Sequence, residues 1–122
     1  VSASVSDWGV LAAEGLAVDV VLASEVLYDP DEAAPLALAA ARLLPNGGAL
    51  LLADPAAGRA VSARAAATRA LEDLGAVVSE TPLEAAQAGD GWYSVRAGGG
   101  DRVDAGEAIV LLKAEWKGPP AL

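Results

Sequence analysis

Residues 18–31 read VDVVLASEVLYDPD. The stretch begins with an apolar run rich in β-branched residues, Val18 to Ala23, which is typical of a strand covered on both faces, as in a parallel α/β sheet. Ser24, Glu25 and Tyr28 come directly after it, where such a strand ends. In open α/β sheets the ligand crevice lies just beyond the carboxyl ends of the strands. The stretch therefore predicts a buried strand that carries candidate functional side chains at its carboxyl end.

The remaining chain alternates between strand-like and helix-like patterns. Predicted strands cover residues 1–6, 18–23, 49–53, 77–81 and 107–115, and predicted helices cover 35–44 and 59–74. This alternation is typical of an α/β domain. The run Gly98-Gly99-Gly100 neither follows a buried strand nor opens a helix, so it is interpreted as a hairpin loop and not as a nucleotide-binding loop.

The first helix is preceded by the signals of a helix start. Asp29 is an N-cap candidate, Pro30 suits the first position, and acidic residues occupy the first turn. Because a proline breaks an established helix, Pro35 predicts that the regular helix begins there. The sheet-facing stripe is then predicted to contain Leu36, Ala40, Leu43 and Leu44.

The second helix, residues 59–74, is rich in alanine and ends before Gly75. Its buried face is predicted to contain Val61, Ala65, Leu71 and Leu74. Its three arginines, Arg59, Arg64 and Arg69, are interpreted as the solvated side of the helix.

Composition excludes several kinds of chemistry. The chain of 122 residues contains no Cys and no His, so disulfides, thiolate metal sites, His-dependent nucleophilic catalysis and the usual zinc sites are excluded within it. No metal site is expected. Its net charge of −9 argues against nonspecific nucleic-acid binding and favours a basic protein partner or substrate.

The length corresponds to one domain or less. No apolar run approaches the length of a membrane span and no signal peptide is recognised, so a soluble intracellular protein, in the cytoplasm or an organelle interior, is expected. The absence of an initiator Met favours processing or a piece of a longer polypeptide.

Three motifs in order carry a resemblance to a known family. They are Ser6-Asp7-Trp8-Gly9, the string of residues 23–30 (ASEVLYDP), and residues 44–48 (LPNGG) with the strand that runs on to Pro55. Together they resemble the carboxyl-terminal part of a class I, seven-β-strand S-adenosylmethionine-dependent methyltransferase, and more narrowly the protein-lysine methyltransferase-like family. The resemblance covers roughly residues 1–80 and weakens after that.

The resemblance implies a fold with part of it missing. The family's sheet has the order 3-2-1-4-5-7-6 with the last strand antiparallel, and this chain corresponds to the third through seventh strands. We therefore expect an α/β, Rossmann-like methyltransferase sheet, mostly parallel, that lacks the first two strands and the glycine-rich cofactor loop. Residues 1–117 would form the carboxyl-terminal half of the domain and 118–122 a tail.

The resemblance also implies roles for individual residues. It places Glu25 and Tyr28 at the catalytic position, where they would orient a lysine amine. The residues that it places at S-adenosylmethionine are Asp7, Trp8, Ala23 and Ser24. The alternative interpretation is structural: Glu25 caps backbone amides, Tyr28 packs on the following helix, and Trp8 is a core or rim aromatic.

Three hypotheses of function remain open. The first is a protein-lysine N-methyltransferase, represented by half of its catalytic domain. The second is a non-catalytic remnant of the same fold that serves as a structural or assembly subunit. The third is a small acidic α/β module of another family, which a different sheet order would favour. The missing half was cut away, lies in a separate chain, or was never present.

Overall fold

The computed structural model describes residues 10, 15–24, 26–57, 60–84, 96–97, 101–102 and 108–122. The predicted strand 1–6, the triple glycine at 98–100 and three of the predicted site residues, Asp7, Trp8 and Glu25, lie outside these described residues.

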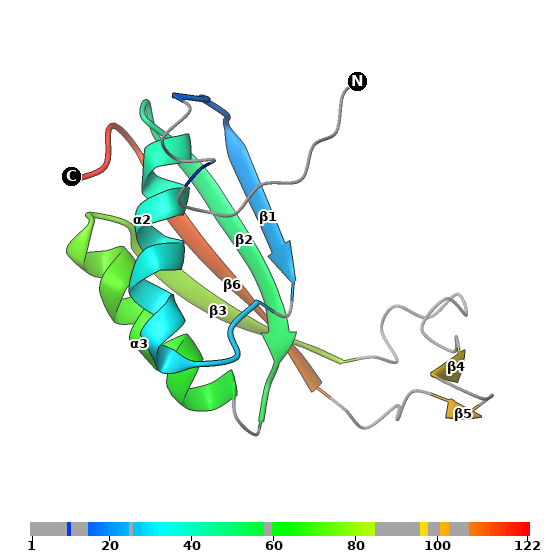
Figure 1. Ribbon diagram of the computed structural model, residues 1–122. Helices are drawn as coiled ribbons and strands as arrows, with labels where there is room; N and C mark the ends of the chain where they lie inside the picture. The colour runs from blue at the N-terminus through cyan, green and yellow to red at the C-terminus, as the bar shows by residue number, and fades with distance from the viewer. Residues whose placement is uncertain are drawn as a thin grey trace.

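The described part of the chain is built on a four-stranded mixed sheet (Figure 1). Its strands are β1 (Val20–Ser24), β2 (Gly48–Pro55), β3 (Val77–Glu84) and β6 (Ala108–Trp116). The order across the sheet is β1-β2-β6-β3, in which β1 and β2 are parallel while β6 is antiparallel to both of its neighbours. Two short strands, β4 (Arg96–Ala97) and β5 (Asp101–Arg102), pair with each other.

This sheet confirms the α/β class and the antiparallel last strand. Its order agrees with the order 4-5-7-6 expected for the last four strands. The predicted strands at 18–23, 49–53, 77–81 and 107–115 are all present with shifted ends. β2 and β3 are longer than predicted because both pair with β6 over eight residues.

A 3-10 helix, η1 (Pro30–Glu32), precedes the first α-helix, and Asp29 is its N-cap as the sequence predicts. The Asp31 amide donates to Asp29 Oδ1 at 2.9 Å. The α-helix α2 (Ala33–Leu43) starts two residues before Pro35, so the prediction that it begins at Pro35 was wrong. A proline at the third position is tolerated because first-turn amides have no intrahelical acceptor.

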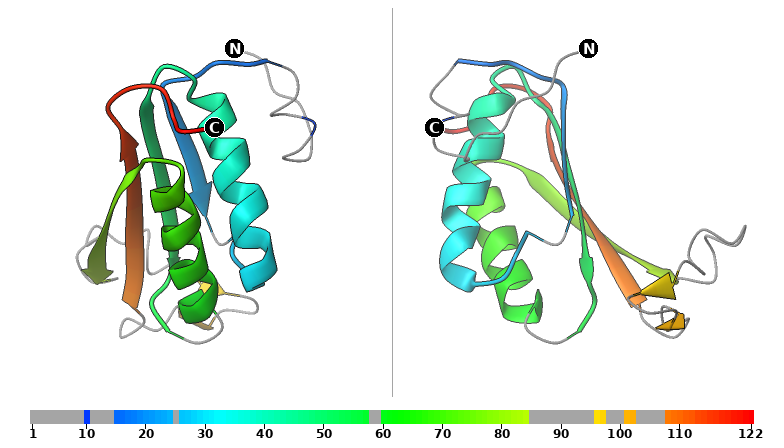
Figure 2. Two further views of the ribbon diagram at one scale, coloured as in Figure 1. Left: turned by 90° about the vertical axis from the view of Figure 1, so that its left-hand side faces the viewer. Right: turned by 45° about the vertical axis from the view of Figure 1, so that its right-hand side comes forward.

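The helices α2 and α3 (Ala60–Asp73) lie on the same face of the sheet, as both views in Figure 2 show. The predicted stripe of α2 is confirmed, since Leu36, Ala40, Leu43 and Leu44 are all buried. The core between helices and sheet contains mainly leucine from the strands and alanine from the helices: Leu50, Leu52, Leu112, Ala37, Ala41, Ala63 and Ala67. The small alanine side chains let the helices approach the sheet closely.

The predicted face of α3 was partly wrong. Leu71 is buried, but Val61 is 49% exposed and Ala65 is also exposed, while Ala63 and Ala67 face the core. The helix is so rich in alanine that nearly every register of the 3.6-residue period offers an apolar stripe. The local pattern therefore could not identify the buried face.

The opposite face of the sheet is uncovered by the described residues. Val20 is 50% exposed and Leu22 is 75% exposed, whereas Val21 and Ala23 of the same strand pack against the core. The expectation that the strand at 18–23 is covered on both faces is thus not met, because both described α-helices lie on one side.

Backbone hydrogen bonds join the segments at the amino-terminal ends of β1 and β2. The Ala49 amide donates to Asp19 O at 3.2 Å, which joins the start of β2 to the residue before β1. At the other end of the chain, Leu74 O accepts from Trp116 Nε1 and from the Ala121 amide, each at 2.9 Å. The segment after β6 therefore packs on the turn between α3 and β3.

Among the described helices, none is long and apolar enough to cross a bilayer.

Candidate functional site

The carboxyl ends of β1 and β2 lie at the same end of the sheet, and this end is termed its carboxyl edge. Ser24 is the register partner of Ala53 in a parallel pair, so Ser24 and the end of β2 with Asp54 and Pro55 lie at the same end of the sheet. Of the predicted cofactor contacts, Ala23 is half-buried against the helices and Ser24 is exposed on the uncovered face. Ser24 is therefore accessible to a ligand beyond the strand ends, while Ala23 packs against the core between the helices and the sheet.

The chain after β1 turns toward the helices and presents Tyr28 to solvent. Leu27 is 2% exposed and belongs to the core, which anchors this segment. Tyr28, the next residue, is 57% exposed. Its side chain therefore reaches solvent in the segment between β1 and the first helical turn.

Acidic side chains come directly after Tyr28. Asp29, Asp31 and Glu32 are all exposed, and they precede the first turn of α2. Asp29 is partly occupied by its capping bond to the Asp31 amide. The edge that carries Ser24 and Tyr28 is therefore negatively charged, which suits a cationic partner better than an anionic one.

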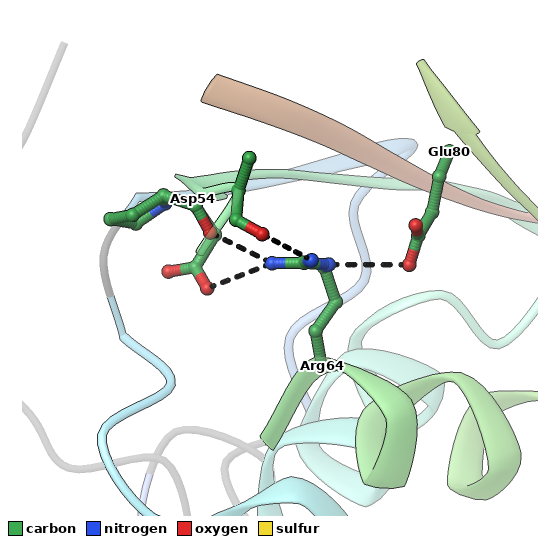
Figure 3. Close-up of polar contacts among 5 residues, drawn as sticks. Asp54, Arg64 and Glu80 are labelled. Carbon is green, nitrogen blue, oxygen red and sulfur yellow. Dashed lines mark hydrogen bonds and ion pairs between the residues drawn. The ribbon is translucent and has the colours of Figure 1, made fainter. Parts of the chain in front are cut away.

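A buried ionic cluster holds the carboxyl end of β2 (Figure 3). Arg64 of α3 donates from Nη1 to Pro55 O at 2.8 Å and from Nη2 to Ala56 O at 3.1 Å. Its Nη1 lies 3.9 Å from Asp54 Oδ2, and its Nε lies 3.3 Å from Glu80 Oε1 of β3. One side chain thus connects a helix to two strands and to the first residue after β2.

The burial of Arg64 corrects the sequence interpretation. Arg64 is 7% exposed and Asp54 is 2% exposed, so Arg64 does not belong to the solvated side of its helix, although Arg69 does. Arg59 lies outside the described residues. Arg64 shares one helical stripe with Ala67 and Leu71, but in a helix so rich in alanine nearly every register offers such a stripe, so this spacing did not distinguish Arg64 from the exposed Arg69. A buried guanidinium is tolerated only when its donors find acceptors and its charge finds a partner; here Pro55 O and Ala56 O accept hydrogen bonds, and the carboxylates of Asp54 and Glu80 lie within ion-pair distance.

The two outer strands of the described sheet differ in character. β1 reads VVLAS, with no charge and no proline, and no described strand pairs with its outer side. β3 reads VVSETPLE and contains Pro82 and two glutamates, features that protect a strand edge from further pairing. The edge of β3 is therefore built to face solvent, whereas the edge of β1 has the composition of a strand that is paired on both sides.

The uncovered face shows the same asymmetry. Over the described strands β1 and β2 it presents Val20, Leu22 and Leu51 and no charged residue. Over β6 and β3 it presents the ion pair of Lys113 with Glu115 (3.7 Å) together with apolar side chains, among them Val77, which is 68% exposed. The apolar half of the face is thus continuous with the unprotected edge of β1.

Comparisons with known proteins add no family to this description. No protein-family model matches the chain, and no curated protein matches it. The function must therefore be inferred from the fold and from the sheet edge that carries Ser24 and Tyr28.

Proposed function

We propose that this chain is the carboxyl-terminal half of the catalytic domain of an S-adenosylmethionine-dependent methyltransferase that acts on protein lysine. The observation that carries the proposal is the strand order β1-β2-β6-β3 with β6 as the single reversed strand of that sheet. The resemblance of residues 1–80 to the methyltransferase family implied this order for the last four strands. The third hypothesis, an unrelated acidic module, would have been favoured by a different order.

The sheet also supports the idea that an amino-terminal half is needed. Parallel sheets are normally covered on both faces, and here the apolar half of one face is open. The connection from β1 through α2 to β2 uses one face of the sheet. Crossovers between parallel strands are right-handed, so strands added in the direction from β1 to β2 place their helices on the face that α2 covers. Helices can cover the other face only if further strands are added in the opposite direction, outward from β1.

Such an arrangement makes the outer edge of β1 a topological switch point. Ligands of open α/β sheets bind at switch points, outside the carboxyl ends of the strands. In the proposed enzyme the cofactor would therefore lie at the carboxyl end of β1, where Ser24 is exposed. The missing strands would complete this pocket. They would belong to the same polypeptide or to a separate chain.

The residues of this edge fit the proposed reaction in part. S-adenosylmethionine supplies an electrophilic methyl group, and the protein must hold a neutral lysine amine in line with it. The exposure of Tyr28 is compatible with a place in such a channel, and Glu25 is the sequence's candidate for a hydrogen-bond acceptor of the amine. The exposed acids after Tyr28 would attract a basic peptide. The glycine-rich loop for the cofactor has no counterpart among the described residues.

A second candidate function is a non-catalytic subunit of the same fold. The observation that favours it is the apolar, unprotected edge of β1, which offers a docking surface whether or not any cofactor binds. In this case replacing Glu25 with Gln and Tyr28 with Phe would leave the assembly intact.

Calorimetric titration of S-adenosylmethionine tests the proposal. We expect no binding to residues 1–122 alone and binding when the polypeptide encoded upstream of Val1 is present. In the complete protein, Tyr28→Phe should reduce methyl transfer to a lysine peptide about tenfold, the value of one hydrogen bond of about 1.5 kcal/mol, with cofactor affinity unchanged. No binding in either form would overturn the methyltransferase proposal and favour the non-catalytic subunit.

A further inference from the structure

We propose that Arg64 is a positioning residue, which holds the backbone after β2 in the shape that the methyl acceptor requires. This inference rests on the proposed function and adds a residue that neither the sequence motifs nor the resemblance assigns. Among the described residues, Arg64 is the basic side chain that lies buried, and it reaches from α3 to the functional edge of the sheet.

The acceptors of Arg64 explain what it holds. Two of its hydrogen bonds go to main-chain oxygens, Pro55 O at 2.8 Å and Ala56 O at 3.1 Å. Pro55 is the last residue of β2, so the two bonds determine the direction in which the chain leaves the strand. A side chain that served only to neutralise a buried carboxylate would not need these two carbonyl groups.

The guanidinium is itself held on both sides. Asp54 Oδ2 lies 3.9 Å from Nη1 and Glu80 Oε1 lies 3.3 Å from Nε, and Figure 3 shows the guanidinium between these two carboxylates. The planar fork of arginine can satisfy two carbonyls and two carboxylates at once, whereas the single ammonium of lysine cannot. The held geometry therefore depends on arginine specifically and not on a positive charge alone.

The location of this segment relates it to the acceptor and not to the cofactor. Ala53 is the register partner of Ser24 in a parallel pair, so Pro55 and Ala56 lie at the same, carboxyl end of the sheet as Ser24. They follow β2, the inner neighbour of β1, whereas the proposed cofactor pocket adjoins the outer edge of β1. A displacement of Pro55 and Ala56 should thus disturb the binding or alignment of the acceptor and leave the cofactor in place.

The test compares Arg64→Lys with Arg69→Lys in the complete enzyme. Arg69 lies on the same helix and is exposed, so its replacement is a matched control. For Arg64→Lys we expect an unchanged Kd for S-adenosylmethionine and a loss of about ten- to hundredfold in kcat/KM for a lysine peptide, the effect of a small misplacement in a reacting geometry. Hydrogen exchange at the Ala56 and Ala57 amides should be faster in this variant than in the control.

Two results would overturn the inference: equal kcat/KM in the two variants, or a loss of cofactor affinity that accompanies the loss of transfer. If the wild-type enzyme transfers no methyl group, the proposed function fails, and amide exchange then decides alone whether Arg64 holds the segment after β2. If Arg64→Lys does not fold, Glu80→Gln replaces it, because Glu80 is 44% exposed and its replacement removes one anchor only. A several-fold loss of kcat/KM with unchanged cofactor Kd would support the inference, and no change would overturn it.

Discussion

Replacing Gly48 with alanine should separate β1 from β2 at the start of the parallel pair. Gly48 has φ +134°, and a Cβ built there would clash with the carbonyl oxygen of Asp19 and lie 3.0 Å from Leu44 Cδ2. That carbonyl accepts the Ala49 amide at 3.2 Å, so it cannot move without weakening the bond between the two segments.

The expected cost combines two contributions. A non-glycine residue in such a rare backbone conformation costs about 1–3 kcal/mol. Displacement of the Asp19 carbonyl weakens a hydrogen bond whose net contribution is about 1 kcal/mol. We therefore expect the free energy of unfolding to fall by about 2–4 kcal/mol. Since urea slopes of small proteins are about 1–3 kcal/mol per molar, the unfolding midpoint should fall by about 0.7–4 M.

Urea unfolding monitored by far-UV circular dichroism measures this shift. Gly118→Ala is the matched control, because a Cβ at Gly118 would meet no atom within 4 Å. We expect its midpoint to stay close to that of the unchanged chain. If the midpoints of the two variants agree to within about 0.3 M, the close approach of Gly48 to Asp19 does not exist and the described pairing at the start of β1 is wrong.

Further predictions concern the core, the open face and the first helix. Leu112→Ala removes a fully buried side chain and should lower the free energy of unfolding by about 2–5 kcal/mol, whereas Leu22→Ala, at a residue 75% exposed, should cost less than about 0.5 kcal/mol in this chain. If thermal unfolding shows the same loss of stability for Leu112→Ala and Leu22→Ala, the reasoning is wrong and the open face is covered. Asp29→Ala removes the cap that accepts the Asp31 amide and should cost about 0.5–2 kcal/mol, while Asp29→Asn should retain most of the stability. Equal melting temperatures of these two variants would contradict the capping role.

Local chemistry explains which elements could be predicted from the sequence. The strand at 18–23 was recognisable because β-branched residues form an unbroken apolar run, and the helix start at Asp29 was recognisable because an N-cap, a proline and acids occur in order. Tyr28 was identified as a candidate because it comes after such a strand, and its side chain is exposed to solvent in the structure. Its proposed role at a lysine amine stays a prediction.

The arginine cluster could not be predicted in the same way. The residues that surround Arg64 come from α3, β2 and β3, and Glu80 is sixteen positions away in the chain. An arginine in an alanine-rich helix has the same local pattern whether it faces water or a carboxylate. Only the packing of α3 on the sheet decides that its donors reach Pro55, Ala56 and two acids.

By itself, then, the sequence determined the α/β class, the positions of the main strands and helices, and the polar edge after the first described strand, because these depend on periodicity and capping among near neighbours. The order expected for the strands came from a family resemblance, and no local pattern contains it. The tertiary structure established that β6 lies between β2 and β3, and it alone showed that both described α-helices cover one face and that Arg64 is buried. These features depend on which distant segments pair and pack, and the free energy of such contacts is not encoded in the residues of any single segment.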